Sequence, residues 1–439
     1  MMRMPNILLL ADTKHHTGAV RDHIEAVIAS PGIQWHVINP ILCKTLDKCD
    51  FSMFDAIGLH YSIKPYNYYY LSRALQQKIA EYRGTKFLFL QDEYQKVNQV
   101  QDYLYRLGFH LLFTLVQQSM VDEAYPDPRL SKLRKVQVLT GYVSDSMRQL
   151  VSPPLASRTI DVAYRGRRCD YWLGSLAYEK EKIAHEFVKR TQGLGLRLDI
   201  SVEESDRVYG NAWWQFLMNA RAVLGTESGA SIWDFDGSAR KATKHFLKKH
   251  KQASFEQIYQ QALKPYDGLF LYSAVSPRVF EAAAAKTPMI LFPGAYSGVC
   301  KAHEHYIVLE KDFSNLGDVI VKLKDLDYLE AMAERAYQDL IVADTYSRKC
   351  FSELISHEVL AMVQQRQYHT LASVENAMMA QLRKYRVLNR VRCIDTELRF
   401  VIANGYALLC DPTLTMSHKM SMISNGIRRY FAYLLPRLR

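Results

Sequence analysis

The sequence lacks any hydrophobic run that could cross a bilayer and any cysteine pattern that could hold a metal or a disulfide framework. Its longest apolar stretches, Ile7–Ala11, Phe87–Leu90 and His110–Val116, are far shorter than the ~20 residues of a membrane-spanning helix. The stretch before Asp12 is too short for a secretory signal. The seven cysteines are scattered and include no Cys-x-x-Cys pair. We therefore expect a cytoplasmic protein whose reduced cysteines serve packing.

Net positive charge is small in the first 360 residues and concentrated at the end of the chain. The 439 residues include 56 Lys+Arg and 45 Asp+Glu, a net charge of +11. Twelve basic and four acidic residues lie in 361–439, so this tail carries +8 and the rest of the chain only +3. A nucleic-acid-binding domain needs a basic face that neutralises phosphates, so we expect no nucleic-acid partner. The remaining composition, 49% hydrophobic, is that of a globular chain.

Short β-rich apolar runs alternate with helical stretches from the start of the chain. Ile7–Ala11, Gln34–Ile38, Ala56–His60 and Lys86–Leu90 have the composition of strands, and Tyr70–Tyr82 has the periodicity of a helix. Strands and helices in alternation predict a parallel, doubly wound sheet. Ligands bind beyond the carboxyl ends of the strands in such sheets, so the loops that follow strands are the candidate functional segments.

A Pro/Ser-rich segment at 151–157 predicts a linker, after which the alternation of strands and helices begins again. We therefore expect an α/β protein with one Rossmann-like domain over 1–150 and a second over 158–355, facing each other across a cleft. Residues 239–266 are charged and helical and have the character of an insertion. A basic, mainly helical extension is expected over 361–439.

Polar residues follow three predicted strands of the first half. The first loop carries His15 and His16 but no Gly-x-Gly-x-x-Gly, so a dinucleotide fingerprint is absent. The next strands end in His60-Tyr61-Ser62 and Gln91-Asp92-Glu93-Tyr94. Because the ends of successive strands meet at one edge of a sheet, we expect these side chains to form a site. A solvated loop is the alternative for the two neighbouring histidines.

Basic and small polar residues follow the strands of the second half. Arg165 and Arg167 come directly after a predicted strand, where they are placed to bind phosphates. The segment 226–231 contains Glu227, Ser228, Gly229 and Ser231, and its composition predicts a turn whose backbone N–H groups cradle an anion. Asp234-Phe235-Asp236 is similar to a metal-binding Asp-x-Asp, although such a pair can equally cap a helix or act in catalysis.

A well-defined helix start lies at Ser276-Pro277, with Ser as N-cap and Pro at the first helical position. Glu281, one turn in, is too polar for its apolar helix unless it faces a ligand. The segment 276–294 resembles the helix–turn–strand of nucleotide-sugar glycosyltransferases with the GT-B fold. The resemblance implies that Glu281 holds the nucleotide ribose. Lys286 replaces the usual Gly of that pattern, and Ser273 stands where a first Glu would lie.

Further segments resemble a bacterial set of GT-B glycosyltransferases, of families 1 and 4, that are encoded with surface-polysaccharide genes. The similarity covers roughly residues 5–355 and rests on an ordered series of short motifs. These motifs are His60-Tyr61-Ser62, Gln91-Asp92-Glu93-Tyr94, Leu139-Thr140-Gly141-Tyr142, Gly225–Ser231, Asp234-Phe235-Asp236-Gly237 and Tyr296-Ser297-Gly298.

The resemblance implies that the N-terminal domain binds an acceptor and the C-terminal domain binds a nucleotide-sugar donor. The residues expected at the donor are Arg165, Arg167, Glu227, Ser228, Gly229, Ser231, Ser276, Arg278, Glu281, Tyr296, Ser297 and Gly298. Those expected at the acceptor are His15, His16, Tyr61 and Tyr94. For an inverting reaction the general base would be His60, Asp92 or Glu93. For a retaining reaction through a covalent adduct the nucleophile would be Asp234 or Asp236.

The expected activity is a hexosyltransferase-like transfer to a glycan or a lipid-linked acceptor in lipopolysaccharide or capsule synthesis. No cofactor or metal is expected, because fixed cations and backbone donors can stabilise the leaving phosphate. A nucleotide-sugar epimerase and a non-catalytic nucleotide-sugar-binding protein are the alternatives. The sequence leaves UDP, GDP, dTDP and CMP open as the donor nucleotide.

The last residues, 423–439, combine an apolar stripe at helical spacing with several arginines. Ile423, Ile427, Phe431 and Leu435 are four of the apolar positions in this stripe. A basic amphipathic helix suits an anionic membrane surface, so peripheral membrane contact is one expectation for this tail. Packing of the stripe on the protein body is the other.

Overall fold

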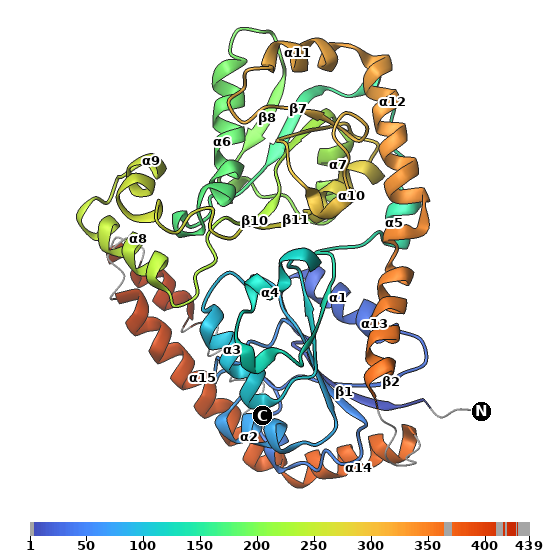
Figure 1. The fold of residues 1–439 in the computed structure, drawn as a ribbon, viewed down its shortest axis with the longest axis vertical. Coiled ribbons are helices and arrows are strands. Elements are labelled where there is room, and N and C mark those ends of the chain that lie inside the picture. The colour runs from blue at the N-terminus through green and yellow to red at the C-terminus, as the bar shows by residue number, and fades with distance from the viewer. Residues whose placement is uncertain (1–3, 364–370, 410–415, 418, 427, 429–439) are drawn as a thin grey trace.

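The computed structural model describes residues 4–363, 371–409, 416–417, 419–426 and 428, and it shows two α/β domains stacked along the long axis (Figure 1). The N-terminal domain contains a six-stranded sheet of order β2-β1-β3-β4-β5-β6, in which every pair is parallel. Its strands are β1 (Asn6–Leu10), β2 (Gln34–Ile38), β3 (Ala56–Leu59), β4 (Thr85–Phe89), β5 (Leu111–Thr114) and β6 (Arg134–Gln137). The central strand β1, Asn-Ile-Leu-Leu-Leu, is buried on both faces, as expected for a parallel sheet covered by helices.

The C-terminal domain contains a five-stranded parallel sheet of order β13-β12-β9-β7-β8. Its strands are β7 (Ile160–Arg165), β8 (Leu198–Ser201), β9 (Ala220–Gly225), β12 (Met289–Leu291) and β13 (Tyr306–Val308). A separate antiparallel pair is formed by β10 (Ser228–Ala230) and β11 (Tyr272–Ala274). The expected fold class, two doubly wound domains in the GT-B arrangement, is confirmed.

Helices connect the strands of both sheets and cover their faces. The N-terminal domain carries α1 (Gly18–Ile28), α2 (Arg73–Glu81) and α3 (Val97–Leu107). The C-terminal domain carries α6 (Ser175–Arg190), α7 (Asn211–Met218), α10 (Pro277–Ala284), α11 (Leu316–Lys324) and α12 (Leu326–Tyr337). The expected insertion is helical: α8 (Ser238–Lys249) and α9 (Phe255–Ile258) project from the side of the molecule in Figure 1.

The chain crosses between the domains twice. The first crossing runs through 151–157, where Val151 is largely exposed, as suits a linker. The second leads into α13 (Arg348–Met362), which packs on α1 of the N-terminal domain. There the Ser352 hydroxyl donates to the Ala26 carbonyl at 2.8 Å. Residues 348–355, expected in the C-terminal domain, therefore lie against the N-terminal one, because the buried face of α13 matches the groove beside α1.

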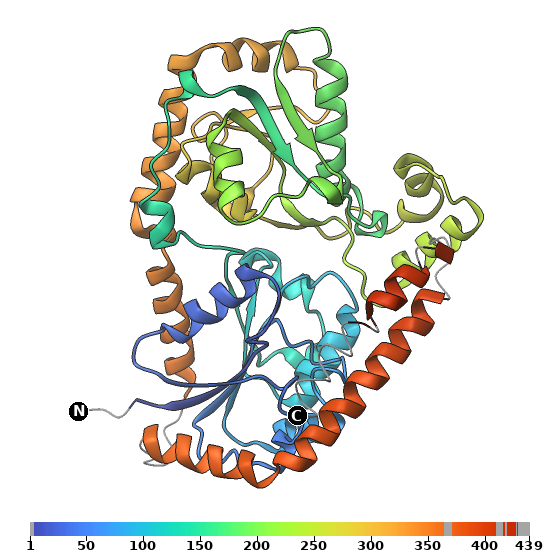
Figure 2. The ribbon, with the colours of Figure 1, turned by 180° about the vertical axis from the view of Figure 1, so that it is seen from behind.

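The C-terminal extension is helical and also packs on the N-terminal domain (Figure 2). It forms α14 (Leu371–Lys384) and α15 (Arg386–Leu409). The Tyr69 hydroxyl donates to Glu397 at 2.7 Å, and Arg392 pairs with Asp47 at 2.6 Å. None of the helices in the described part of the chain is long and apolar enough to span a membrane. The amphipathic stripe expected over 423–439 lies largely outside the described residues.

Candidate functional site

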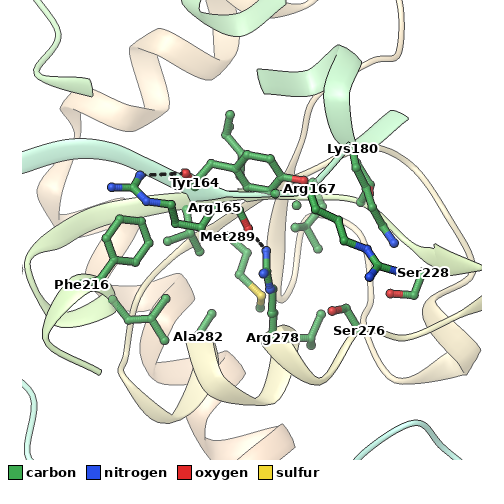
Figure 3. A pocket seen from close by; sticks show the side chains of 18 of the residues that line it. Tyr164, Arg165, Arg167, Lys180, Phe216, Ser228, Ser276, Arg278, Ala282 and Met289 are labelled. Carbon is green, nitrogen blue, oxygen red and sulfur yellow. Dashed lines mark hydrogen bonds between the residues drawn. The ribbon is translucent and has the colours of Figure 1, made fainter. Parts of the chain in front are cut away.

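A pocket opens at the carboxyl ends of β7, β9 and β12 in the C-terminal domain (Figure 3). We call it the C-terminal pocket. Its floor is apolar and aromatic, and its mouth is basic. The floor residues are Tyr164, Trp213, Phe216, Leu217, Val223, Leu224, Met289 and Leu291, and the polar residues are Arg165, Arg167, Lys180, Arg207, Ser228, Ser276 and Arg278. A pocket with an apolar, aromatic floor and a basic mouth fits a planar base with an anionic group attached to it.

Three cations at the mouth of the pocket, Arg167, Lys180 and Arg278, make no ion pair with any described carboxylate. In Figure 3, Arg167 and Lys180 end beside Ser228, whereas Arg278 rises from α10 to their left and donates to the Arg165 backbone carbonyl. Burial lowers the pKa of the Lys180 ammonium, and the neighbouring cations lower it further. Cations that make no close ion pair gain energy when an anion binds, so this arrangement can hold an anionic group.

The sequence analysis did not single out Lys180. It lies inside a helix with several Lys and Glu residues, and most of them are part of an ordinary solvated helix face. Only the packing of α6 against β8, β9 and β10 brings this lysine to the loop that carries Arg167. No local motif distinguishes Lys180 from Lys182 or Lys189, so its role became visible only in the tertiary structure.

Arg165 is engaged differently from Arg167, although both were expected to bind phosphates. Its guanidinium donates to Asp199 Oδ1 at 2.6 Å and to the backbone carbonyls of Asp199, Asp206 and Tyr164. It also lies over the Phe216 ring, 4.5 Å from the centroid. These contacts use most of its donors, so Arg165 forms a wall of the pocket and leaves Arg167 as the arginine of that loop with free donors.

Glu281 lies where the C-terminal pocket meets the space between the domains. Its Oε2 accepts a hydrogen bond from Trp213 Nε1 at 2.8 Å, and the Trp213 ring carries the Arg278 guanidinium at 5.1 Å from its centroid. Burial raises the pKa of the Glu281 carboxyl, and the bond from Trp213 partly offsets the effect. The ring thus orients a carboxylate and a cation together, which supports the expectation that Glu281 contacts a ligand.

The segment expected to form an anion-cradling turn is in fact the strand β10. Gly229 has φ +124°, and a Cβ there would lie 1.9 Å from the Tyr272 carbonyl oxygen, so only glycine fits. Ser228 and Gly229 still border the cavity between the domains. Ser231 does not, because its hydroxyl bonds to Asp267 and accepts from Leu176 N. The turn prediction is wrong because pairing with β11 extends the backbone.

Glu227 and the segment 296–298 make hydrogen bonds that connect neighbouring loops beside the pocket. One carboxylate oxygen of Glu227 accepts from Tyr296 N at 2.7 Å, and Ser297 Oγ accepts from Val275 N at 3.0 Å. Tyr296 is fully buried, and neither it nor Gly298 lines the pocket or the space between the domains. The geometry gives these residues a supporting position, and their expected role in donor binding stays a prediction.

A cavity lies between the two domains, and we call it the interdomain cavity. The ends of the N-terminal strands meet there, as expected. The N-terminal side contributes Asp22, His23, Tyr61, Asp92, Tyr94 and Tyr142, and the C-terminal side contributes Arg167, Lys180, Ser228, Gly229 and Glu281. Arg167, Lys180 and Ser228 border both this cavity and the C-terminal pocket, so one ligand can extend from one into the other.

Asp92 and Glu93 are neighbours in sequence but differ in environment. Asp92 adopts a left-handed backbone, φ 54°, and its exposed carboxylate accepts from the Tyr94 hydroxyl at 3.0 Å in the cavity. Glu93 is buried beneath the sheet edge, where it accepts from Thr114 Oγ1 at 2.5 Å and Leu115 N at 2.8 Å. Burial raises the pKa of Glu93 to about 6. Of the two carboxylates, only Asp92 can reach a ligand.

The histidines predicted at the site lie around the cavity rather than in it. His60 is fully buried and bonds to His23, which does border the cavity. His15 and His16 stack on each other, 4.5 Å between ring centroids, in a loop outside the cavity lining. Tyr61 borders the cavity as expected. The sequence analysis missed His23, because a single histidine on an amphipathic helix carries no signal of its own.

Asp234 and Asp236 do not face the interdomain cavity. Asp234 accepts from Gly237 N at 3.0 Å and Arg240 N at 3.2 Å, and Asp236 accepts from Ser238 N at 2.9 Å. Both carboxylates therefore fix the turn into α8. This geometry agrees with the capping alternative for the Asp-x-Asp pair. Their expected role as a nucleophile stays a prediction, and neither side chain lines the interdomain cavity.

No family model and no curated protein matches the sequence. Solved structures do resemble the fold. One is an alpha-glucosyltransferase in complex with UDP-glucose and DNA containing an abasic site, with 9% identity and TM-score 0.49 over 82% of this chain and 100% of that one. Another is Anabaena Alr3699/HepE in complex with UDP and glucose, with 13% identity and TM-score 0.44 over 81% and 99%. A third is TarM, with 10% identity and TM-score 0.41 over 71% of this chain and 55% of that one.

The expectation that this protein has no nucleic-acid partner is wrong as an exclusion, since a structure of similar fold was solved with DNA. The argument from net charge failed because a sum hides local concentration. Residues 238–266 include seven basic residues and one acidic residue, within a body that carries only +3. Several of these cations are exposed on one face of α8, namely Lys241, Lys244, Lys248 and Lys249. A nearly neutral body can thus present a strongly basic surface.

Proposed function

We propose that the protein is a glycosyltransferase that binds a nucleotide sugar with its nucleotide in the C-terminal pocket and its sugar in the interdomain cavity. The observation that carries the proposal is the pair Arg167 and Lys180 at the junction of the two spaces, with Arg278 in the C-terminal pocket beside them. A diphosphate placed there would have its base on the aromatic floor of the pocket. Glu281, oriented by Trp213, would lie beside the ribose.

Transfer requires that negative charge develop on the leaving phosphate. Fixed cations at that point stabilise the transition state more than the ground state, so Arg167 and Lys180 would promote departure of the nucleotide. Activity without a divalent cation is part of the proposal. Asp92, across the cavity, is placed to take the proton of an attacking hydroxyl in an inverting reaction. A glycan or lipid-linked acceptor of a surface polysaccharide is the proposed partner.

A thermal-shift panel of UDP, GDP, dTDP and CMP tests the proposal, because a ligand that binds only the folded protein raises its melting temperature. One nucleotide should stabilise the wild-type protein, and Lys180→Ala should abolish most of that shift. Lys189→Ala, an exposed lysine on the same helix, is the matched control and should behave as wild type. A panel without any shift would contradict a nucleotide site.

A further inference from the structure

Two buried histidines from different elements form a hydrogen-bonded chain at the wall of the interdomain cavity. His60 follows β3, and His23 lies on the buried face of α1. His60 Nε2 and His23 Nδ1 are 2.9 Å apart. On its other side, His60 Nδ1 is 2.9 Å from the Ser62 hydroxyl oxygen, which accepts from Asp12 N at 2.9 Å. The mechanism proposed above uses neither imidazole.

The backbone determines which nitrogen of each ring carries a proton. Ser62 N–H donates to His60 Nδ1 at 3.1 Å, so that nitrogen is an acceptor and carries no hydrogen. A neutral His60 must then be protonated on Nε2, from which it donates to His23 Nδ1. His23 in turn accepts on Nδ1 and is protonated on Nε2. The fixed N–H of Ser62 thereby sets the tautomer of a ring two hydrogen bonds away.

The surroundings of His23 keep it neutral and leave its Nε2 available. Aromatic rings pack edge-on against it at centroid distances of 4.9 Å for Tyr61, 5.7 Å for Phe89 and 5.1 Å for Phe351. Burial lowers the pKa of His23 to about 3. His23 borders the interdomain cavity, and its Nε2 makes no hydrogen bond to any residue that the structure describes. A neutral N–H donor without a protein acceptor is therefore left at the cavity wall.

We propose that His23 donates a hydrogen bond from Nε2 to an oxygen atom of the sugar bound in the interdomain cavity, and that His60 is the positioning residue that holds His23 in this donor state. The identity of the ligand as a sugar rests on the proposed function. In this arrangement the lone pair of His23 Nδ1 is occupied, so neither ring accepts the proton of the attacking hydroxyl. That task falls to Asp92 across the cavity.

The tautomer is tested first, on the full chain without substrate. In a protein labelled with ¹⁵N-histidine, the His23 signals are assigned by their loss in His23→Gln. At pH 7 they should show an unprotonated Nδ1 and a protonated Nε2. His60→Leu removes the donor to Nδ1 and should produce a mixture of both tautomers, whereas His60→Gln, which keeps an N–H donor, should restore the wild-type pattern. A protonated Nδ1 in the wild-type protein would overturn the inference, whether or not the protein is a transferase.

The role of the donor is tested by turnover of UDP-glucose, or of GDP- or dTDP-glucose where the thermal-shift panel selects that nucleotide. His23→Phe keeps an aromatic ring and removes the N–H, and it should lower kcat/KM about tenfold, the value of one neutral hydrogen bond. His23→Gln, which keeps a donor, should retain most activity. The melting-temperature shift with the free nucleotide should be unchanged in both. Equal kcat/KM in wild type and His23→Phe would contradict the inference, whereas absence of nucleotide binding in the wild type would contradict the proposed function.

Discussion

The two faces of the interdomain cavity differ in how their polar groups are satisfied. On the C-terminal face, Arg167 and Lys180 make no ion pair with any carboxylate among the described residues. On the N-terminal face, His60 and Glu93 are buried and every polar atom of their side chains has a partner. A partly buried charge without an ion-pair partner destabilises the protein unless a ligand of opposite charge binds beside it. A buried hydrogen-bond network in which every group has a partner holds its side chains in one position. The comparison indicates a charged ligand on one face and precise positioning on the other.

The largest effect is expected from Asp92, the exposed carboxylate of the N-terminal face. Asp92→Asn removes the proposed base and should lower kcat by about 100-fold or more, the usual contribution of general base catalysis. The affinity for nucleotide should change much less than kcat, because the pocket proposed for the nucleotide lies in the other domain. Steady-state kinetics with isothermal titration calorimetry separate the two effects. Glu123→Gln, an exposed carboxylate in the same domain, is the control, and a kcat equal to wild type in Asp92→Asn would remove Asp92 from the mechanism.

The second effect concerns the unpaired cations of the C-terminal face. Lys180→Ala should raise the Kd for the nucleoside diphosphate roughly 10- to 100-fold, since a hydrogen bond to a charged group contributes roughly 1.5–3 kcal/mol. Calorimetry at two salt concentrations checks the electrostatic origin. Arg165→Ala should weaken binding less than Arg167→Ala, because Arg165 is already bonded to Asp199. A larger loss of affinity in Arg165→Ala than in Arg167→Ala would contradict the assignment of Arg165 to the pocket wall and of Arg167 to the ligand.

A smaller effect is expected at Trp213, which orients Glu281 and Arg278. Trp213→Phe keeps a ring beneath Arg278 and removes the Nε1 donor to Glu281. The Kd for nucleotide should rise about threefold to tenfold, less than in Lys180→Ala, because the lost bond orients Glu281 and does not itself contact the ligand. Glu281→Gln should have a similar effect, and the double variant should be less than additive because the two residues act as one unit. Full additivity in calorimetry would show that they act independently.

The smallest expected effect tests whether Glu93 is structural. Its pKa is raised to about 6 in the folded protein from an ordinary 4.5. Below pH 4.5 the Glu93 carboxyl is protonated in both the folded and the unfolded protein, so its burial does not lower stability. As pH rises from 4.5 through 6, the unfolded protein loses this proton first, and the free energy of unfolding falls by about 2 kcal/mol from this group. Glu93→Gln should flatten the pH dependence of urea denaturation between pH 4.5 and 7. An unchanged slope with a large loss of turnover would instead favour a catalytic Glu93.

Much of the architecture could be predicted from the sequence because it depends on local pattern. The buried run Ile7–Ala11 and the N-cap and Pro of Ser276-Pro277 determine a strand and a helix start within a few residues. The identity of a loop residue as ligand-facing or buried could not be predicted, as Asp92 and Glu93 show. Both lie in the loop after β4, where Asp92 has a left-handed backbone, and Glu93 is buried because Thr114 and Leu115, at the end of β5, bind its carboxylate.

The charge of the chain illustrates the same division. Composition correctly located a basic tail, but the sum over the first 360 residues concealed the basic face of α8. Charges add along a sequence without regard to distance, whereas electrostatic potential depends on which side chains lie close together in space.

The sequence by itself determined two doubly wound domains, a linker between them and a helical extension, because hydrophobic periodicity and breaker residues act over a few neighbours. Only the tertiary structure decided that Lys180 joins Arg167 and Arg278, that α13 returns to the N-terminal domain, and that Ser62 fixes the proton on His23. Each of these depends on contacts between elements distant in the chain, and such contacts follow from packing rather than from local pattern.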